Sequence, residues 1–186
     1  NKNEIEEINS GKDVPEIMDQ LTGVVISSDA GAGVGYTGMR VRGSDATRIN
    51  VTINGIPIND AESQSMYWVD MPDLLSSTNQ IQLQRGVGTS VNGAAAFGAS
   101  INILTDHLSE KPFAETNLSY GTFNTKKVNL IAGTGLLNNH FAFETRLSSI
   151  QSDGYVDRAT SDLKSFYFSG GYFGQKSMLK AIMFSG

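Results

Sequence analysis

The clearest pattern along the chain is an alternation of apolar and polar positions in its C-terminal part. From residue 112 onward, the segments FAETNLSYG and KKVNLIAG change face at every residue, and LKSFYFSGGYF and SMLKAIMFS continue this less cleanly. The segment HFAFETRLSSI is the most regular, with Phe141, Phe143, Thr145 and Leu147 on one face and Ala142, Glu144, Arg146 and Ser148 on the other. The period of two predicts about five long antiparallel strands.

The length of these strands allows two interpretations. They reach the ~9–11 residues that a tilted strand needs to cross a bilayer. Their connections also differ, since GLLNN and GQK are short whereas QSDGYVDRATSD is longer. Short turns at one end and longer loops at the other are typical of a membrane barrel. A soluble sheet with one wet face gives the same alternation, so the pattern leaves both alternatives open.

The N-terminal part has shorter elements. Residues 1–12 are polar and are expected to form a flexible lead-in. In DVPEIMDQLTGV, Asp13 can cap a helix, Pro15 fits its first turn and Gly23 can end it. Strands are expected at VVISS, MRVR, RINVTI, NQIQLQ and INILT, with a tight turn at Asn54-Gly55 and a second short helix at MPDLLSS. Residues up to about 108 therefore predict a compact unit of helices and short strands.

A glycine-rich loop stands between the first two of these strands. Its residues Gly33-Val34-Gly35-Tyr36-Thr37-Gly38 match the pattern G-x-G-x-x-G of dinucleotide-binding folds. That fold needs a helix directly after the third glycine, so that the helix N-terminus faces the pyrophosphate. Here an alternating strand follows, which argues against a nucleotide site. The glycines then serve sharp turns, or the close approach of a ligand to the backbone.

Composition narrows the chemistry. The chain has 186 residues and no cysteine, which excludes disulfides and thiolate metal sites within it. Its net charge of -5 argues against nucleic acid as a partner. The two histidines, His107 and His140, lie on different expected elements, so no metal site is expected. Neither a nucleophile elbow nor paired carboxylates are visible. We expect no cofactor and no enzymatic activity.

Several motifs in sequence order resemble the plug domain of TonB-dependent outer-membrane transporters. They are DVPEIMDQLTGVVI, MRVRGSD, INVTINGIPIND and IQLQRGVGTSVNGAAAFGASINILT, while YGTFNTKK and SDGY resemble the first barrel strands of that family. The departures are small: Asn54 stands where Asp is commoner, Gln82 where Glu is frequent and Phe97 where Tyr is frequent.

The resemblance implies an α+β plug domain with a short mixed sheet and short helices over residues 13–108. The first antiparallel strands of an incomplete transmembrane β-barrel would follow over residues 109–186, within a barrel of about 22 strands. The implied function is energy-coupled import of a scarce nutrient across the Gram-negative outer membrane. Its partners would be outer-membrane lipid, TonB through a segment upstream of Asn1, and a ferric siderophore, haem, cobalamin, oligosaccharide or peptide. The alternative is a soluble plug-like interaction module without a transport role.

Two groups of site residues are expected. By the resemblance, Arg42 and Arg85 form a plug–barrel latch with glutamates of the barrel wall beyond Gly186; the alternative is two ordinary surface arginines. The long polar loop NDAESQSMYWVD is the most ligand-like segment, although Trp68 is better explained by packing. The ligand-facing candidates in this loop and the glycine loop are Gly33, Gly35, Tyr36, Asp60, Glu62, Gln64, Tyr67 and Trp68.

Overall fold

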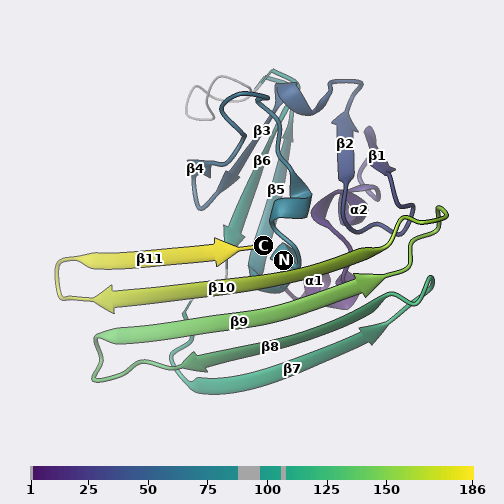
Figure 1. The fold of residues 1–186 in the computed structure, drawn as a ribbon. Coiled ribbons are helices and arrows are strands. Elements are labelled where there is room, and N and C mark those ends of the chain that lie inside the picture. The colour runs from purple at the N-terminus through teal and green to yellow at the C-terminus, as the bar shows by residue number, and fades with distance from the viewer. Residues whose placement is uncertain (1, 88–96, 106–107) are drawn as a thin grey trace.

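The computed structural model describes residues 2–87, 97–105 and 108–186, which form two layers (Figure 1). An N-terminal unit, residues 2–105, is built of short helices and strands. It packs against one face of a long five-stranded sheet, the C-terminal sheet, which spans residues 112–185 (Figure 1). No helix within the described residues is long and apolar enough to cross a bilayer.

The N-terminal unit contains two small sheets. Its helical elements are α1 (Lys2–Ile8), α2 (Val14–Met18) and the 3-10 turns η1 (Ala46–Arg48), η2 (Trp68–Asp70) and η3 (Leu74–Ser77). Its strands are β1 (Val24–Ser28), β2 (Thr37–Val41), β3 (Ile49–Ile53), β4 (Ile56–Pro57), β5 (Thr78–Arg85) and β6 (Ala99–Thr105). Strands β1 and β2 pair antiparallel, and the other sheet has the order β4-β3-β6-β5 with β3 parallel to β6. This confirms the expected short mixed sheet.

Sequence patterns locate most of these elements, with local differences. Residues 2–8 form a helix where a flexible lead-in is expected, because Ile5 inserts into the core and is only 5% exposed. Helix α2 ends at Met18, earlier than expected, and Asp13 stands at its N-cap position without capping it. The segment MPDLLSS gives a 3-10 turn that starts after Asp73, whose φ of 55° is left-handed.

The C-terminal sheet is an antiparallel meander. Its strands are β7 (Pro112–Tyr120), β8 (Lys126–Thr134), β9 (Phe141–Ser152), β10 (Ser161–Phe173) and β11 (Met178–Ser185). Each pairs with its neighbour in sequence, in the order β11-β10-β9-β8-β7. The connections 121–125 and 153–160 lie at one end of the sheet, and the connections 135–140 and 174–177 at the other (Figure 1).

The distribution of polar and apolar side chains between the two faces of this sheet is the reverse of that in a soluble protein. On β8 and β9 the polar residues Asn129 and Arg146 face the N-terminal unit and are 1% and 2% exposed. Their apolar neighbours Leu130 and Leu147 point away and are 47% and 53% exposed. A polar buried face with an apolar outer face is the alternation of a membrane barrel strand, so the structure favours that alternative over a sheet with one wet face.

Candidate functional site

The contact between the two layers centres on Asp73, which directly precedes η3. The residue is 3% exposed, and its carboxylate receives donors from two strands of the C-terminal sheet. Lys127 Nζ lies 2.6 Å from Oδ1, while Ser148 Oγ and Asn129 Nδ2 donate to Oδ2 at 2.6 Å and 3.1 Å. The alternation of β8 and β9 brings these side chains to one face, and the left-handed backbone of Asp73 directs the acid toward them.

Arg146 of β9 holds the backbone beside this carboxylate. Its Nη1 donates to the carbonyl oxygen of Asp73, and its Nη2 donates to the carbonyl oxygen of Pro72 at 3.4 Å and to Ser165 Oγ at 3.3 Å. The guanidinium also lies 5.9 Å from the centre of the Tyr167 ring. Lys127 thus binds the side chain of the acid, and Arg146 binds its main chain.

Electrostatics keeps Asp73 ionised. Burial alone would raise the pKa of its carboxyl group, but the charges of Lys127 and Arg146 and the hydrogen bonds outweigh burial and hold this pKa below the usual range. A buried charge is stable only when it is paired and fully hydrogen-bonded. Removing one partner of a buried pair therefore costs more free energy than removing one partner of an exposed pair. This group can therefore fix the N-terminal unit on the sheet.

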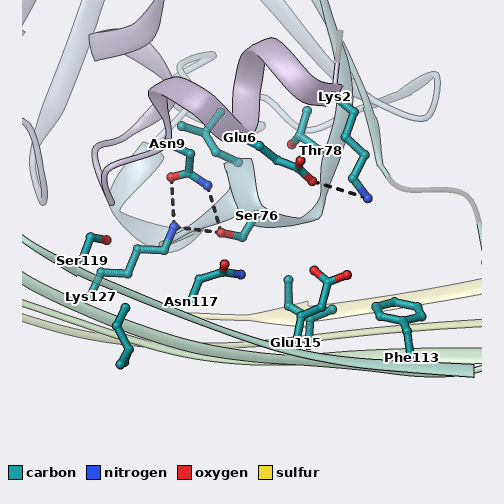
Figure 2. A pocket seen from close by; sticks show the side chains of 13 residues that line it. Lys2, Glu6, Asn9, Ser76, Thr78, Phe113, Glu115, Asn117, Ser119 and Lys127 are labelled. Carbon is teal, nitrogen blue, oxygen red and sulfur yellow. Dashed lines mark hydrogen bonds and ion pairs between the residues drawn. The ribbon is translucent and has the colours of Figure 1, made fainter.

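Two further residues of the N-terminal unit complete the group. Ser76 Oγ donates to Asp73 Oδ1 at 2.7 Å. Asn9, just after α1, donates to Ser76 Oγ at 2.9 Å and accepts from Lys127 Nζ at 2.9 Å (Figure 2). We call the set the Asp73 cluster, and its members are Asn9, Asp73, Ser76, Lys127, Asn129, Arg146 and Ser148.

The glycine loop makes the second contact between the layers. The carbonyl oxygen of Ala30 accepts from the backbone N–H of Tyr155 at 2.7 Å and of Val156 at 3.2 Å, both in the connection between β9 and β10. Gly31 has a φ of 67°, and a Cβ there would lie 3.0 Å from the Cβ of Tyr155. The left-handed backbone and the crowding by the Tyr155 side chain therefore favour glycine at this position.

Asp13, at the N-cap position of helix α2, binds the same loop. Asp13 accepts from Thr37 Oγ1 at 2.8 Å, and its N–H donates to the carbonyl oxygen of Gly33 at 2.9 Å. Burial raises the pKa of the Asp13 carboxyl group to about 7; Glu16 adds to the rise, and the hydrogen bonds of Thr37 and Gly35 oppose it. Asp13 thus fastens the loop in place of capping the helix.

The ligand-facing candidates differ in accessibility. Gly33 and Gly35 are buried at positive φ, and Tyr36 beside them is 66% exposed. In the second loop, Glu62, Gln64 and Tyr67 are exposed.

Asp60 is exposed too, but its carboxylate accepts from the backbone N–H groups of Ser63 and Glu62 and organises its own turn. Trp68 is 5% exposed in the hydrophobic core, which agrees with the packing alternative. Glu62, Gln64 and Tyr67 are thus exposed in this loop, whereas Asp60 and Trp68 contribute to its own structure.

The two arginines proposed for plug–barrel contacts lie at strand ends. Arg42 follows β2 and Arg85 ends β5, and both side chains are exposed. Neither forms an ion pair with any residue that the structure describes. Their role toward glutamates beyond Gly186 stays a prediction.

The histidines lie apart from this contact. His107 falls outside the described residues, and His140 is exposed and stacks on Tyr172 at 6.0 Å. Among the residues that the structure places, no three His, Asp or Glu side chains gather as metal ligands would.

Sequence reasoning missed the Asp73 cluster. Its hydrogen-bonded members lie up to 118 positions apart, and the motif MPDLLSS indicates only a helix start. Two local signals point toward it. One is an acid between apolar neighbours at Asp73, and the other is the charge of Lys127 and Arg146 on the strand faces opposite Leu130 and Leu147.

Comparison with known proteins gives a consistent result. Residues 1–100 match the family described as TonB-dependent Receptor Plug Domain. The chain is 26% identical over 125 residues to the vitamin B12 transporter BtuB of Vibrio cholerae serotype O1, covering 67% of this chain and 20% of that protein. It is 31% identical over 122 residues to BtuB of Photobacterium profundum, covering 65% and 19%. The chain therefore spans about a fifth of the length of these curated relatives.

Solved structures share the fold at low identity. The siderophore receptor PirA from Acinetobacter baumannii superposes with a TM-score of 0.77 at 13% identity, over 98% of this chain and 30% of that one. The ferric yersiniabactin uptake receptor FyuA from Yersinia pestis gives a TM-score of 0.73 at 11% identity, over 96% and 30%. At these identities the likeness describes the arrangement of both layers and not their ligand.

Proposed function

Because the chain belongs to the TonB-dependent receptor plug domain family, we propose that it is part of an energy-coupled importer of the Gram-negative outer membrane. The N-terminal unit is the plug, and the C-terminal sheet is the start of the barrel wall. One observation carries the proposal: the wall face toward the plug is buried and carries most of the polar side chains of β8 to β10, and the opposite face is largely apolar and exposed. The first suits a lumen, and the second suits lipid.

The ligand is proposed to approach from the end of the wall where the connections 121–125 and 153–160 lie. The glycine loop is hydrogen-bonded to the second of these connections, so the plug and the wall form one surface there. Tyr36 and Tyr155 are exposed on it, at 66% and 71%. The loop that carries Asp60, Glu62, Gln64 and Tyr67 supplies further candidate contacts, with Trp68 supporting it from the core.

The substrate class is proposed from the relatives. The curated relatives are vitamin B12 transporters, and the structural neighbours include siderophore receptors. Cobalamin and ferric siderophores are therefore the first ligands to test.

TonB is proposed to act on a segment on the N-terminal side of α1, as the family membership suggests. In this proposal the plug consists of α1 and residues 13–108, and the first strands of the wall lie within residues 109–186.

The first experiment locates the full-length protein in fractionated native cells with an antibody against this segment. A heat-modifiable band in the outer membrane is expected. Uptake of labelled cyanocobalamin and of a ferric siderophore is then compared in cells with and without TonB, and TonB-dependent uptake is the expected result. A soluble band near 20.0 kDa would contradict the transporter and support the soluble interaction module.

A further inference from the structure

Two lysines stand on the outer face of the wall, the face turned away from the plug. The strand pairing places Lys126 of β8 and Lys164 of β10 on the same side as Leu130 and Leu147, and both lysines are exposed. The other charged residue on this face of β7 to β11 is Asp162. Neither lysine forms an ion pair with any residue in the described part of the chain.

Aromatic side chains mark the two rims of the outer face. Tyr120 is in register with Lys126 at one rim, and Tyr172 is in register with Phe141 at the other. From Phe141 to Gln151, which is in register with Lys126, β9 rises ~33 Å along its own axis, or ~25 Å across the membrane at the usual strand tilt. This equals the height of the apolar band of a membrane barrel, so Lys126 lies at the level of the lipid headgroups.

Lys164 lies slightly deeper, inside the apolar band. It follows two residues after Asp162, which is in register with Gln151 at the rim, and it is itself in register with Ser149. A lysine at this depth is best accommodated when its apolar stem lies along the surface and its ammonium reaches an anion at headgroup level. Asp162 does not supply that anion, because the two side chains form no ion pair.

An open groove of about 710 Å³ runs along the outer face beside Lys164. The other outward-facing side chains that line it are Val128, Leu130, Leu147, Ser149 and Phe166. Ser149 is the smallest of them and leaves space between its larger neighbours. An apolar groove with a cation toward the rim complements a lipid that has an anionic headgroup and an acyl chain.

We propose that Lys126 and Lys164 bind a phosphate group of lipid A, the phosphorylated glycolipid of the outer leaflet, and that one of its acyl chains lies in this groove. The inference rests on the proposed function, because it needs the wall in the outer membrane with the connections 121–125 and 153–160 toward the outside. The charge of the lysines selects the phosphate, and their rim of the apolar band selects the outer leaflet.

The test titrates the full-length protein in detergent with lipid A and measures the affinity by native mass spectrometry. The wild type is expected to bind lipid A more tightly than lipid A from which the phosphates have been removed. Lys164→Gln is expected to weaken lipid A binding about fivefold, as is usual for one basic residue near an anionic lipid surface, and Lys164→Arg should retain it. The matched control is Lys176→Gln, an exposed lysine in the connection at the other end of the sheet, which should change nothing.

A second variant tests the groove separately from the charge. Ser149→Trp fills the groove and is expected to weaken binding of lipid A and of its phosphate-free form alike. Thr145→Trp, on the same face of β9 but outside the groove, is the control. A folded barrel, shown by its heat-modifiable band, would overturn the site if it bound both forms equally or if Lys164→Gln bound lipid A as the wild type does. The proposed function fails separately, if the wild type shows no outer-membrane band and no TonB-dependent uptake.

Discussion

At the scale of single residues, the Asp73–Lys127 pair decides how firmly the plug is held. Both side chains are at most 3% exposed, so neither can be solvated by water when its partner is lost. Asp73→Asn removes the charge and leaves the Lys127 ammonium buried and unpaired. We expect the plug in the full-length protein to lose about 3–5 kcal/mol of unfolding free energy, as is usual for a broken buried pair. Hydrogen exchange of plug amides in urea measures this loss.

Two variants control this prediction. Asp157→Asn changes an acid whose side chain is 98% exposed, and its effect is expected to stay within about 0.5 kcal/mol. The double variant Asp73→Asn/Lys127→Met removes both charges and should be more stable than Asp73→Asn alone. Equal losses in the single and the double variant would contradict the pairing.

Asp13 gives the plug a pH dependence of its own. Burial, with Glu16 next, raises the pKa of this carboxyl group to about 7 in the folded protein, against about 3.9 for an unperturbed Asp. The folded state therefore binds the proton more tightly than the unfolded state. The contribution of Asp13 to stability is full below pH ~4, falls as the pH rises toward 7, and is constant above that.

The measurement is the unfolding free energy of the plug between pH 5 and 8 for wild type and Asp13→Asn. The wild type is expected to lose stability relative to the variant as the pH rises through this interval. Asp73 does not disturb the comparison, because its lowered pKa means that its own contribution is lost only on acidification below this interval. A constant difference between the two proteins would show that Asp13 titrates normally.

At the scale of elements, the turn between β3 and β4 combines two roles in one residue. Asn54 has a φ of 51° and binds β6 through its amide, donating to Thr105 Oγ1 at 2.9 Å and accepting from Thr105 N–H at 3.1 Å. Asn54→Ala is expected to cost about 1–3 kcal/mol, because it leaves the Thr105 N–H unsatisfied and strains the turn. Asn54→Asp keeps the acceptor and should cost less. Urea unfolding of both variants tests this order, and a costlier Asp variant would contradict it.

The same elements show how far sequence patterns reach. The Asn54-Gly55 turn and the alternation of β9 depend on neighbours in the sequence, so local pattern and turn chemistry predict them. The position of helix α1 depends on one side chain, Ile5, which packs into a core formed by strands distant in the sequence. The Asp73 cluster joins residues far apart in sequence, such as Asp73 and Ser148. Only the pairing register of β8 and β9 brings its donors together, and the pattern of one strand does not contain that register.

At the scale of the whole molecule, the two faces of the wall are expected to differ in the free-energy cost of a charged substitution. Leu130 points outward near the middle of β8, and Leu130→Arg is expected to cost about 2–4 kcal/mol because it places a charge in lipid. Ser119→Arg on the inner face of β7 should cost much less, since Ser119 faces a partly polar cavity between β7 and the plug. The heat-modifiable fraction of each full-length variant in lipid, followed against urea, measures both. Equal costs would contradict the assignment of the faces.

The Asp73 cluster also limits which plugs and walls are interchangeable. A chimera that sets this plug into a foreign wall without a cation at the position of Lys127 would bury an uncompensated carboxylate. The reverse chimera, with this wall around a plug that lacks an acid before η3, would leave Lys127 and Arg146 buried without the carboxylate that pairs with them here. Compatibility between the two parts can therefore be read at a few positions: one acid in the plug, a lysine and an asparagine two residues apart on β8, and an arginine on β9.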